Sequence, residues 1–371
     1  MIQKFSLEVL VTVLGCINVV TSSHFRGGSI FWKPTGNSYE VEFSAKLGWA
    51  YRTYSCSSSN LNVYQPSSIV DWKCVSGCPV HGTIVNAKRP GLTCTGFEAL
   101  QNWERTESTF SYVFPAPGPY VIEFTGGYWI GALGSGDWRL LTTVNLHTRS
   151  DTLAPNTSPV VPSKPVYYVK YGCKETLRLP VSDADGDNVA CRWSTGTECE
   201  SICYSAGKAP VATLQTNCDL TIDATHKKSG VYALAITIED KPTSTITIGS
   251  TTYAPSRVIS SVPLQFVLET PDLPTRSCSD KPIFLDPTPS QNDVLVYRPG
   301  DIVYLSFYAT SRAATIKSFS LLDPPTNVRQ SALRNDDMFR PDVYAMDLTW
   351  TPLHADKGSK TICVEATDNF L

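Results

Sequence analysis

The chain is poor in the residues and motifs that enzymes use. Its 371 residues include five histidines, and it lacks the HExxH, GxSxG and P-loop patterns. It also lacks an excess of either charge, because 31 Lys and Arg stand against 34 Asp and Glu. This balance gives no sign of the basic surface that binds nucleic acid. We therefore expect neither an enzyme nor a nucleic-acid-binding protein.

Long amphipathic helices and long apolar runs are also scarce. The most helix-like stretch, residues 97–105, gives about two turns. Residues 7–20 are mostly apolar, follow Lys4 and precede small residues, which predicts a secretory signal peptide over residues 1–23. An uncleaved anchor is the alternative. Because the chain stops directly after a strand-like run, we interpret it as C-terminally truncated, and a membrane anchor in a longer parent chain stays open.

Short stretches of alternating apolar and polar residues recur instead. A period of two over four to eight residues is typical of half-buried strands. Pro and Gly, 26 and 23 in number, separate these stretches. The pattern predicts an all-β protein with strands near residues 39–43, 109–114, 120–124, 140–146, 176–181, 232–238, 262–268, 302–307 and 360–364.

Two Pro-rich segments, 152–159 and 270–275, read as linkers. They divide the chain into predicted modules over residues 24–152, 158–270 and 275–371. The second and third modules are close to the size of one β-sandwich. The first is larger and contains a loop-rich insertion rich in Cys and Trp.

The cysteines predict disulfides and therefore an oxidising compartment. Beyond Cys16 in the signal there are eleven, an odd number: Cys56, Cys74, Cys78, Cys94, Cys173, Cys191, Cys199, Cys203, Cys218, Cys278 and Cys363. We expect bonds inside 56–94 and inside 173–218, with Cys278 to Cys363 closing the third module. Zinc at the two C-x3-C pairs, Cys74/Cys78 and Cys199/Cys203, is the alternative.

An acidic turn is the candidate metal site. Asp183, Asp185 and Asp187 flank Gly186, and Asp240 follows a later strand. Carboxylates at alternating positions around a glycine bend supply oxygens that suit Ca²⁺. The alternative is a solvated turn, because Asp and Gly are common turn residues. The sequon at Asn156 in the first linker predicts N-glycosylation.

The first module also concentrates tryptophan. These residues form either a core beside the disulfides, which we favour, or an aromatic platform for a ligand. The segments 126–129 and 131–138 are the candidate surface loops. The six are Trp32, Trp49, Trp72, Trp103, Trp129 and Trp138.

Several segments carry a family resemblance. They are residues 23–28 (SHFRGG) through Trp32, residues 156–159, residues 179–187 with the cysteines that follow, and residues 348–352 and 366–368. Together they resemble an uncharacterised invertebrate family of secreted or membrane ectodomains, with an HFRGG-type module before Ig- or cadherin-like repeats. The complete cadherin linker patterns are absent.

The resemblance implies tandem Ig- or cadherin-like β-sandwich domains at the cell surface or outside the cell. It also implies adhesion, matrix assembly or receptor-type recognition of a protein or glycan partner. An alternative is a secreted copper-dependent polysaccharide-oxidising enzyme. In that reading His24 is the mature N-terminus, and His81 or His147 is the second ligand.

Overall fold

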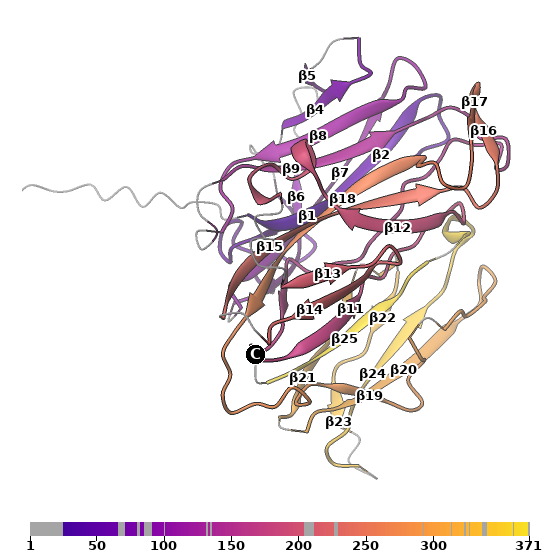
Figure 1. Cartoon of the computed structure of the whole chain (residues 1–371). Coiled ribbons are helices and arrows are strands. Elements are labelled where there is room, and N and C mark those ends of the chain that lie inside the picture. Colours follow the sequence, from indigo (N-terminus) through magenta and orange to yellow (C-terminus); the bar gives the residue numbers. More distant parts are fainter. Residues whose placement is uncertain are drawn as a thin grey trace, which may run out of the picture.

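The computed structural model shows a protein built from β-strands (Figure 1). In the described ranges the other regular elements are short 3-10 helices, η2 (Gly196–Glu198), η3 (Glu200–Ile202) and η5 (His354–Asp356), which confirms the predicted all-β class. No helix there is long and apolar enough to cross a membrane. The predicted signal peptide, His24 and His81 lie outside those ranges. The structure describes residues 25–65, 71–79, 82–84, 91–99, 101–130, 133, 136–203, 211–225, 229–291, 293–312, 314–322, 324–325, 327–335, 340–358 and 360–369.

A nine-stranded sheet forms the centre of the molecule. Its strand order is β12-β15-β18-β1-β2-β7-β6-β3, with β10 paired in parallel to β18. The sheet combines strands of the first and second predicted modules. The division of the chain at residues 152–158 remains a prediction. The strands are β1 (Phe25–Pro34), β2 (Glu40–Trp49), β3 (Tyr64–Gln65), β6 (Leu92–Glu98), β7 (Trp103–Val113), β10 (Val166–Tyr168), β12 (Asn188–Trp193), β15 (Gly230–Lys241) and β18 (Ser260–Thr270).

The join between β1 and β18 depends on a glycine. These strands pair antiparallel, with Gly27 opposite Phe266 and Gly28 opposite Gln265. Gly27 has a φ of +110°, and a Cβ there would lie 2.1 Å from the carbonyl oxygen of Gln265. Only glycine fits this position without a shift of the backbone. The HFRGG segment therefore has a structural role at the centre of the sheet.

Two smaller sheets cover opposite faces of the central sheet. One has the order β5 (Gly82–Thr83), β4 (Asp71–Ser76), β8 (Tyr120–Gly126), β9 (Trp138–Val144), and the other has the order β11 (Lys174–Arg178), β14 (Asp219–Asp223), β13 (Ala212–Leu214). On β15, Ala233 and Ala235 belong to the core under the first sheet, and Leu234 belongs to the core under the second. Such strands are buried on both faces rather than half-buried. In Figure 1 the layers follow one another from top to bottom.

The tryptophans of the first module are core residues. Trp129 and Trp138 pack around Phe25, whose ring stacks on Trp138 with 4.0 Å between centroids. Of the six, Trp103 is half-buried and the other five are buried. In the candidate surface loop, Tyr128 is the exposed aromatic residue. The structure therefore offers no tryptophan platform to a ligand on the described surface.

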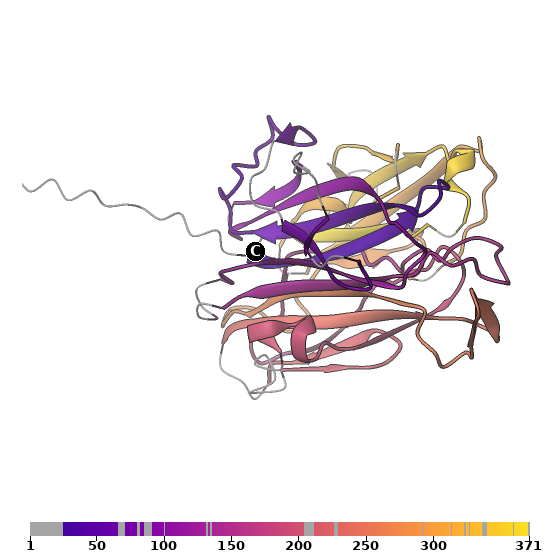
Figure 2. The same cartoon turned by 90° about the horizontal axis from the view of Figure 1, so that it is seen from above.

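Residues 283–369 form a separate pair of sheets with a core of their own. Seen from above, the strands of the different layers run in roughly the same direction (Figure 2). An ion pair between Lys164 and Glu365 connects this region to the central sheets. The larger sheet contains β19 (Ile283–Leu285), β20 (Val303–Thr310), β22 (Arg329–Gln330), β23 (Arg334–Asn335) and β24 (Tyr344–Trp350), and the smaller contains β21 (Ile316–Leu322) and β25 (Cys363–Asp368).

Disulfides connect the described strands and loops. Two bonds lie inside 56–94 and two inside 173–218, in the ranges that the sequence predicts. The predicted bond from Cys278 to Cys363 is wrong, because Cys278 is bonded to Cys173 and so ties the third region to the second. Zinc at the two C-x3-C pairs is also wrong, because each pair is a disulfide. The five bonds are Cys56–Cys94, Cys74–Cys78, Cys173–Cys278, Cys191–Cys218 and Cys199–Cys203.

Candidate metal centre

The predicted acidic residues lie where the central sheet meets the first linker. The turn of residues 183–187 leads into β12, and Asp240 is near the end of β15, which pairs with β12. Gly186 has a φ of +82°, which permits the turn. Residues 149–158, which overlap the predicted linker of residues 152–159, contact the turn and the end of β15 through Arg149, Asn156 and Thr157. The backbone thus brings acidic residues of two strands to one place.

Three carboxylates come together there. Asp183, Asp187 and Asp240 each offer one oxygen, and these oxygens lie within 4.8 Å of one another. Asp183 Oδ1 accepts the backbone N–H groups of Asp185 at 2.9 Å and Asp187 at 3.1 Å. Asp183 Oδ2 is buried and has no hydrogen-bond partner. A buried carboxylate oxygen in this state is costly, since water is not there to solvate it.

Asp185 has a different role from its neighbours. Its Oδ2 accepts the backbone N–H of Thr157 at 2.7 Å and lies 3.6 Å from Arg149 Nη1. It therefore anchors the linker and is outside the group of three. Of the four residues predicted as calcium ligands, the structure gathers Asp183, Asp187 and Asp240 and separates Asp185.

A buried arginine, absent from the sequence prediction, faces the same turn. The side chain of Arg149 is 1% exposed and donates through both Nη atoms to Asp187. Its Nε and Nη2 atoms also donate to Asp151, at 3.0 and 2.7 Å. A guanidinium that binds two carboxylates in this way stays protonated. No local pattern in the sequence links Arg149 to a turn 38 residues later.

Asn156 joins the arginine to the buried acid. Its Oδ1 accepts from Arg149 Nη1, and its Nδ2 donates to Asp240 Oδ2 at 2.6 Å. The residue is 0% exposed. An N-glycan is attached through Nδ2, so a glycan cannot be accommodated in this packing. The structure argues against the predicted glycosylation of Asn156 in the folded chain.

The cluster carries an excess of negative charge. Burial raises the pKa of Asp183 to about 6 and that of Asp240 to about 7, and neighbouring carboxylates add to both shifts. Asp240 Oδ1 accepts the N–H of Ser260 at 2.6 Å, which partly offsets its burial. The charged forms of these acids therefore lack full compensation from the protein.

The remaining sequence candidates do not assemble into a second site in the described residues. His147 is half-buried, and its Nδ1 lies 3.0 Å from Asn145 Oδ1. His24 and His81 lie outside the described ranges, so the structure does not test the copper hypothesis. Trp103 is half-buried and its Nε1 donates to Gln101.

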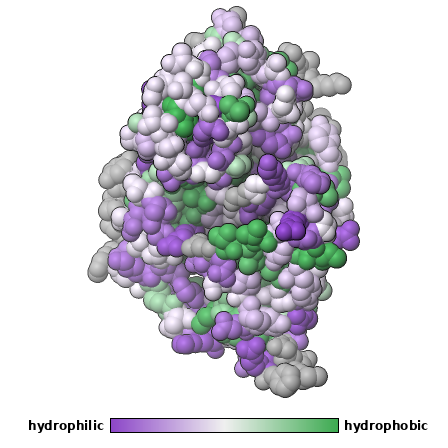
Figure 3. Space-filling model, turned by 90° about the vertical axis from the view of Figure 1, so that its right-hand side faces the viewer, coloured by the Kyte–Doolittle hydropathy of each residue, from purple (hydrophilic) through white to green (hydrophobic). Residues whose placement is uncertain are grey.

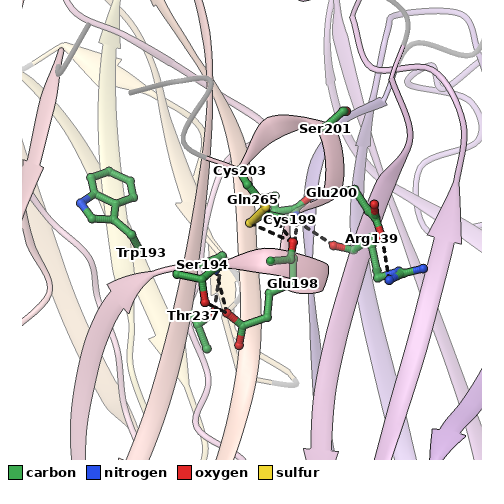
Figure 4. The surroundings of a disulfide bond; sticks show 12 residues. Arg139, Trp193, Ser194, Glu198, Cys199, Glu200, Ser201, Cys203, Thr237 and Gln265 are labelled. Atoms are coloured by element: carbon green, nitrogen blue, oxygen red, sulfur yellow. Dashed lines mark hydrogen bonds and ion pairs between the residues drawn. A yellow bond between two sulfur atoms is a disulfide. The ribbon is translucent and has the colours of Figure 1, made fainter. Parts of the chain in front are cut away.

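The Cys199–Cys203 disulfide lies beside a contact between sheets (Figure 4). Arg139 of β9 forms an ion pair with Glu200 at 2.6 Å. Gln265 of β18 donates through Nε2 to the carbonyl oxygens of Arg139 and Glu198, at 2.7 and 3.3 Å. This disulfide therefore belongs to a structural junction, where it closes the loop that carries η3. Arg139 and Gln265 connect this loop and η2 to β9 and β18.

Comparison with known proteins gives one family match. A family model described as "Integrin beta-like protein A-E, N-terminal" matches residues 26–147, about a third of the chain. This segment contains the β1–β2 hairpin and the four-stranded sheet. The chain is also similar to "Integrin beta-like protein C" of Dictyostelium discoideum, with 24% identity over 194 residues. That alignment covers 50% of the chain and 10% of the relative, so the chain spans about a tenth of that relative's length.

Solved structures of immunoglobulin-domain proteins give weak matches. A complex of Dpr2 Ig1-Ig2 with DIP-Theta Ig1-Ig3 matches at 9% identity, with a TM-score of 0.16, over 88% of this chain and 92% of that chain. The titin fragment I67-I69 matches at 9% identity and a TM-score of 0.16, over 90% and 89%. Scores of this size carry no argument about the fold. The invertebrate origin of the expected ectodomain family remains a prediction.

Proposed function

We propose that the chain is part of an extracellular adhesion or receptor-type protein, secreted or held at the cell surface, and that it binds a protein partner. Five disulfides in the described residues support an oxidising compartment. The family match over residues 26–147 supports a module related to integrin beta-like proteins. A non-enzymatic role agrees with both.

An exposed apolar surface carries the proposal. Val294 and Val296 are 87% and 89% exposed, and Ile302 in the same loop is 77% exposed. The hydrogen bond from Gly300 N–H to Pro352 O brings this loop beside the exposed Leu353. Clusters of exposed aliphatic side chains mark protein contact sites on extracellular domains and elsewhere. Figure 3 shows hydrophobic residues gathered on one face among polar ones.

The chemistry of this surface favours a protein over a glycan. Sugar rings stack on flat aromatic side chains, and the tryptophans of the described residues are buried or half-buried. In this loop the aromatic residue Tyr297 is 39% exposed, whereas the aliphatic Val294 and Val296 are 87% and 89% exposed. Aliphatic side chains instead gain free energy by removing apolar area from water against another apolar surface. We therefore name residues 294–302 with Leu353 the apolar loop surface, and we infer that it contacts a protein.

Attachment of cells to immobilised chain tests the proposal. Surfaces coated with the unmodified chain are expected to retain cells of the source organism. The double variant Val294→Asp/Val296→Asp should reduce attachment at least several-fold, because each charge would have to be desolvated at the interface. These side chains are exposed, so the fold should be unaffected.

The matched control is Leu61→Asp/Val63→Asp, which changes two exposed apolar residues of the first module. This variant should keep full attachment. Absence of attachment by the unmodified chain would contradict the adhesive function. Equal attachment by both double variants would contradict the apolar loop surface as the contact site.

A further inference from the structure

The carboxylates around the 183–187 turn outnumber the cations that the protein supplies. Arg149 is in contact with Asp151, Asp185 and Asp187, and Asp183 and Asp240 lie beside Asp187. In the described residues, one guanidinium thus contacts three carboxylates, and two more lie beside one of them. The side chains of Arg149 and Asp187 are nearly fully buried, so bulk water and salt screen this imbalance poorly.

One carboxylate oxygen of this group, Asp183 Oδ2, has no hydrogen-bond partner and indicates which kind of ligand fits. Asp183 is 6% exposed, and its Oδ2 is buried without a hydrogen-bond partner, while its Oδ1 accepts two N–H groups. The backbone therefore holds this carboxylate in one orientation and leaves one oxygen for another group. A cation suits this position, because one oxygen each of Asp183, Asp187 and Asp240 lie within 4.8 Å of one another.

We propose that Asp183, Asp187 and Asp240 bind one Ca²⁺ ion at the junction of the turn, the end of β15 and the first linker. Each of the three carboxylates offers one oxygen, and water or backbone oxygens would complete the six to eight that Ca²⁺ takes. Asp187 can serve both Arg149 and the ion, because each carboxylate oxygen has two lone pairs. No sulfur or imidazole is among the three ligands, which selects a hard cation over zinc or copper.

The choice of Ca²⁺ over Mg²⁺ follows from where the ligands lie in the chain. Mg²⁺ requires near-octahedral geometry and keeps several waters, whereas Ca²⁺ tolerates irregular ligands from different segments. Here the ligands come from a turn and from a strand 53 positions further along the chain, and Asn156 links that strand to Arg149. The bound ion would hold the linker against the sheet. This inference does not depend on the adhesive function.

Calcium titration of the full chain after EDTA treatment tests the site. Calorimetry should show one ion bound per chain, with a dissociation constant of roughly 10⁻⁴–10⁻³ M, as in extracellular modules. The melting temperature should rise over the same concentrations, because the ion binds the folded state. Mg²⁺ should bind at least several-fold more weakly.

Asp183→Asn and Asp185→Asn form a matched pair. Asp183→Asn should weaken calcium binding at least tenfold, and Asp185→Asn should leave it within about threefold. In EDTA, Asp183→Asn should melt no lower than the unmodified chain, because it removes a buried charge that the ion is not there to balance. That readout separates a lost ligand from a damaged fold.

Three results would overturn the site. The first is no heat and no change of melting temperature at several millimolar Ca²⁺. The second is an equal loss of binding in Asp183→Asn and Asp185→Asn. The third is Mg²⁺ binding as tight as Ca²⁺ binding, which would contradict the assignment of the site to Ca²⁺.

Discussion

The side-chain nitrogen of Asn156 donates to the carboxylate of Asp240 at 2.6 Å, in a place where neither residue reaches solvent. The chain should therefore carry no glycan at Asn156 when it is secreted from eukaryotic cells. Peptide mass spectrometry with and without glycosidase checks this expectation. A folded chain with a glycan on Asn156 would contradict the structure.

Removal of the Asn156 side chain should destabilise the fold. Asn156→Ala leaves Asp240 Oδ2 and Arg149 Nη1 each short of one partner. We expect a loss of about 1–3 kcal/mol in the free energy of unfolding, measured by urea denaturation. Asn37→Ala, at an exposed turn, is the control and should change stability by less than about 0.5 kcal/mol.

Substitution of Gly27 should break the join between β1 and β18. Gly27→Ala places a Cβ 2.1 Å from the carbonyl oxygen of Gln265, and only a shift of the backbone relieves the clash. We expect a loss of at least about 3 kcal/mol or failure to fold. Gly36→Ala is the control, because Gly36 also has a positive φ but an open surrounding. It should cost about 1 kcal/mol. Equal thermal stability of the two variants would be evidence against the shared sheet.

The bond between Cys173 and Cys278 should appear in peptide mapping without reduction. It closes a loop of 105 residues, for which the chain-entropy model gives about 4–5 kcal/mol, less any strain. The double variant Cys173→Ser/Cys278→Ser should lower the free energy of unfolding by about 2–5 kcal/mol. Recovery of a peptide that joins Cys278 to Cys363 would restore the sequence-based pairing and contradict the structure.

Stability at low pH should depend on Glu198. Burial alone would raise the pKa of Glu198, but hydrogen bonds from Arg192 and from the N–H of Thr195 outweigh it, so the pKa lies below its ordinary value. The folded chain then binds a proton more weakly than the unfolded chain does. This contribution to stability is present above about pH 4.3 and is lost as the pH falls through the folded-state pKa.

Urea unfolding between pH 3 and pH 6 measures this dependence. Glu198→Gln should lower stability at pH 6 and should flatten the fall in stability toward pH 3. Identical slopes in the unmodified chain and in Glu198→Gln would show that Glu198 has the same pKa in the folded and unfolded chains.

The sequence by itself determined where several strands lie. The alternating residues 120–124 and 232–238 lie inside β8 and β15, as expected from their period of two, although β15 is buried on both faces. Periodicity was misleading at residues 97–105. Their pattern is helix-like, but they include the end of β6 and the start of β7. The C-x3-C spacings and the acidic turn were also visible locally.

Only the tertiary structure decided which segments meet. The pairing of β1 with β18, the bond from Cys173 to Cys278 and the contact of Arg149 with Asp187 each join residues that no local pattern connects. The sequence predicts that Asn156 is an exposed glycosylation site. In the structure it is buried and bonds to Arg149 and Asp240, because its segment folds over the start of β12 and the end of β15. Burial and charge compensation depend on which residues become neighbours in the folded sheet. Spacing along the chain does not show which residues these are.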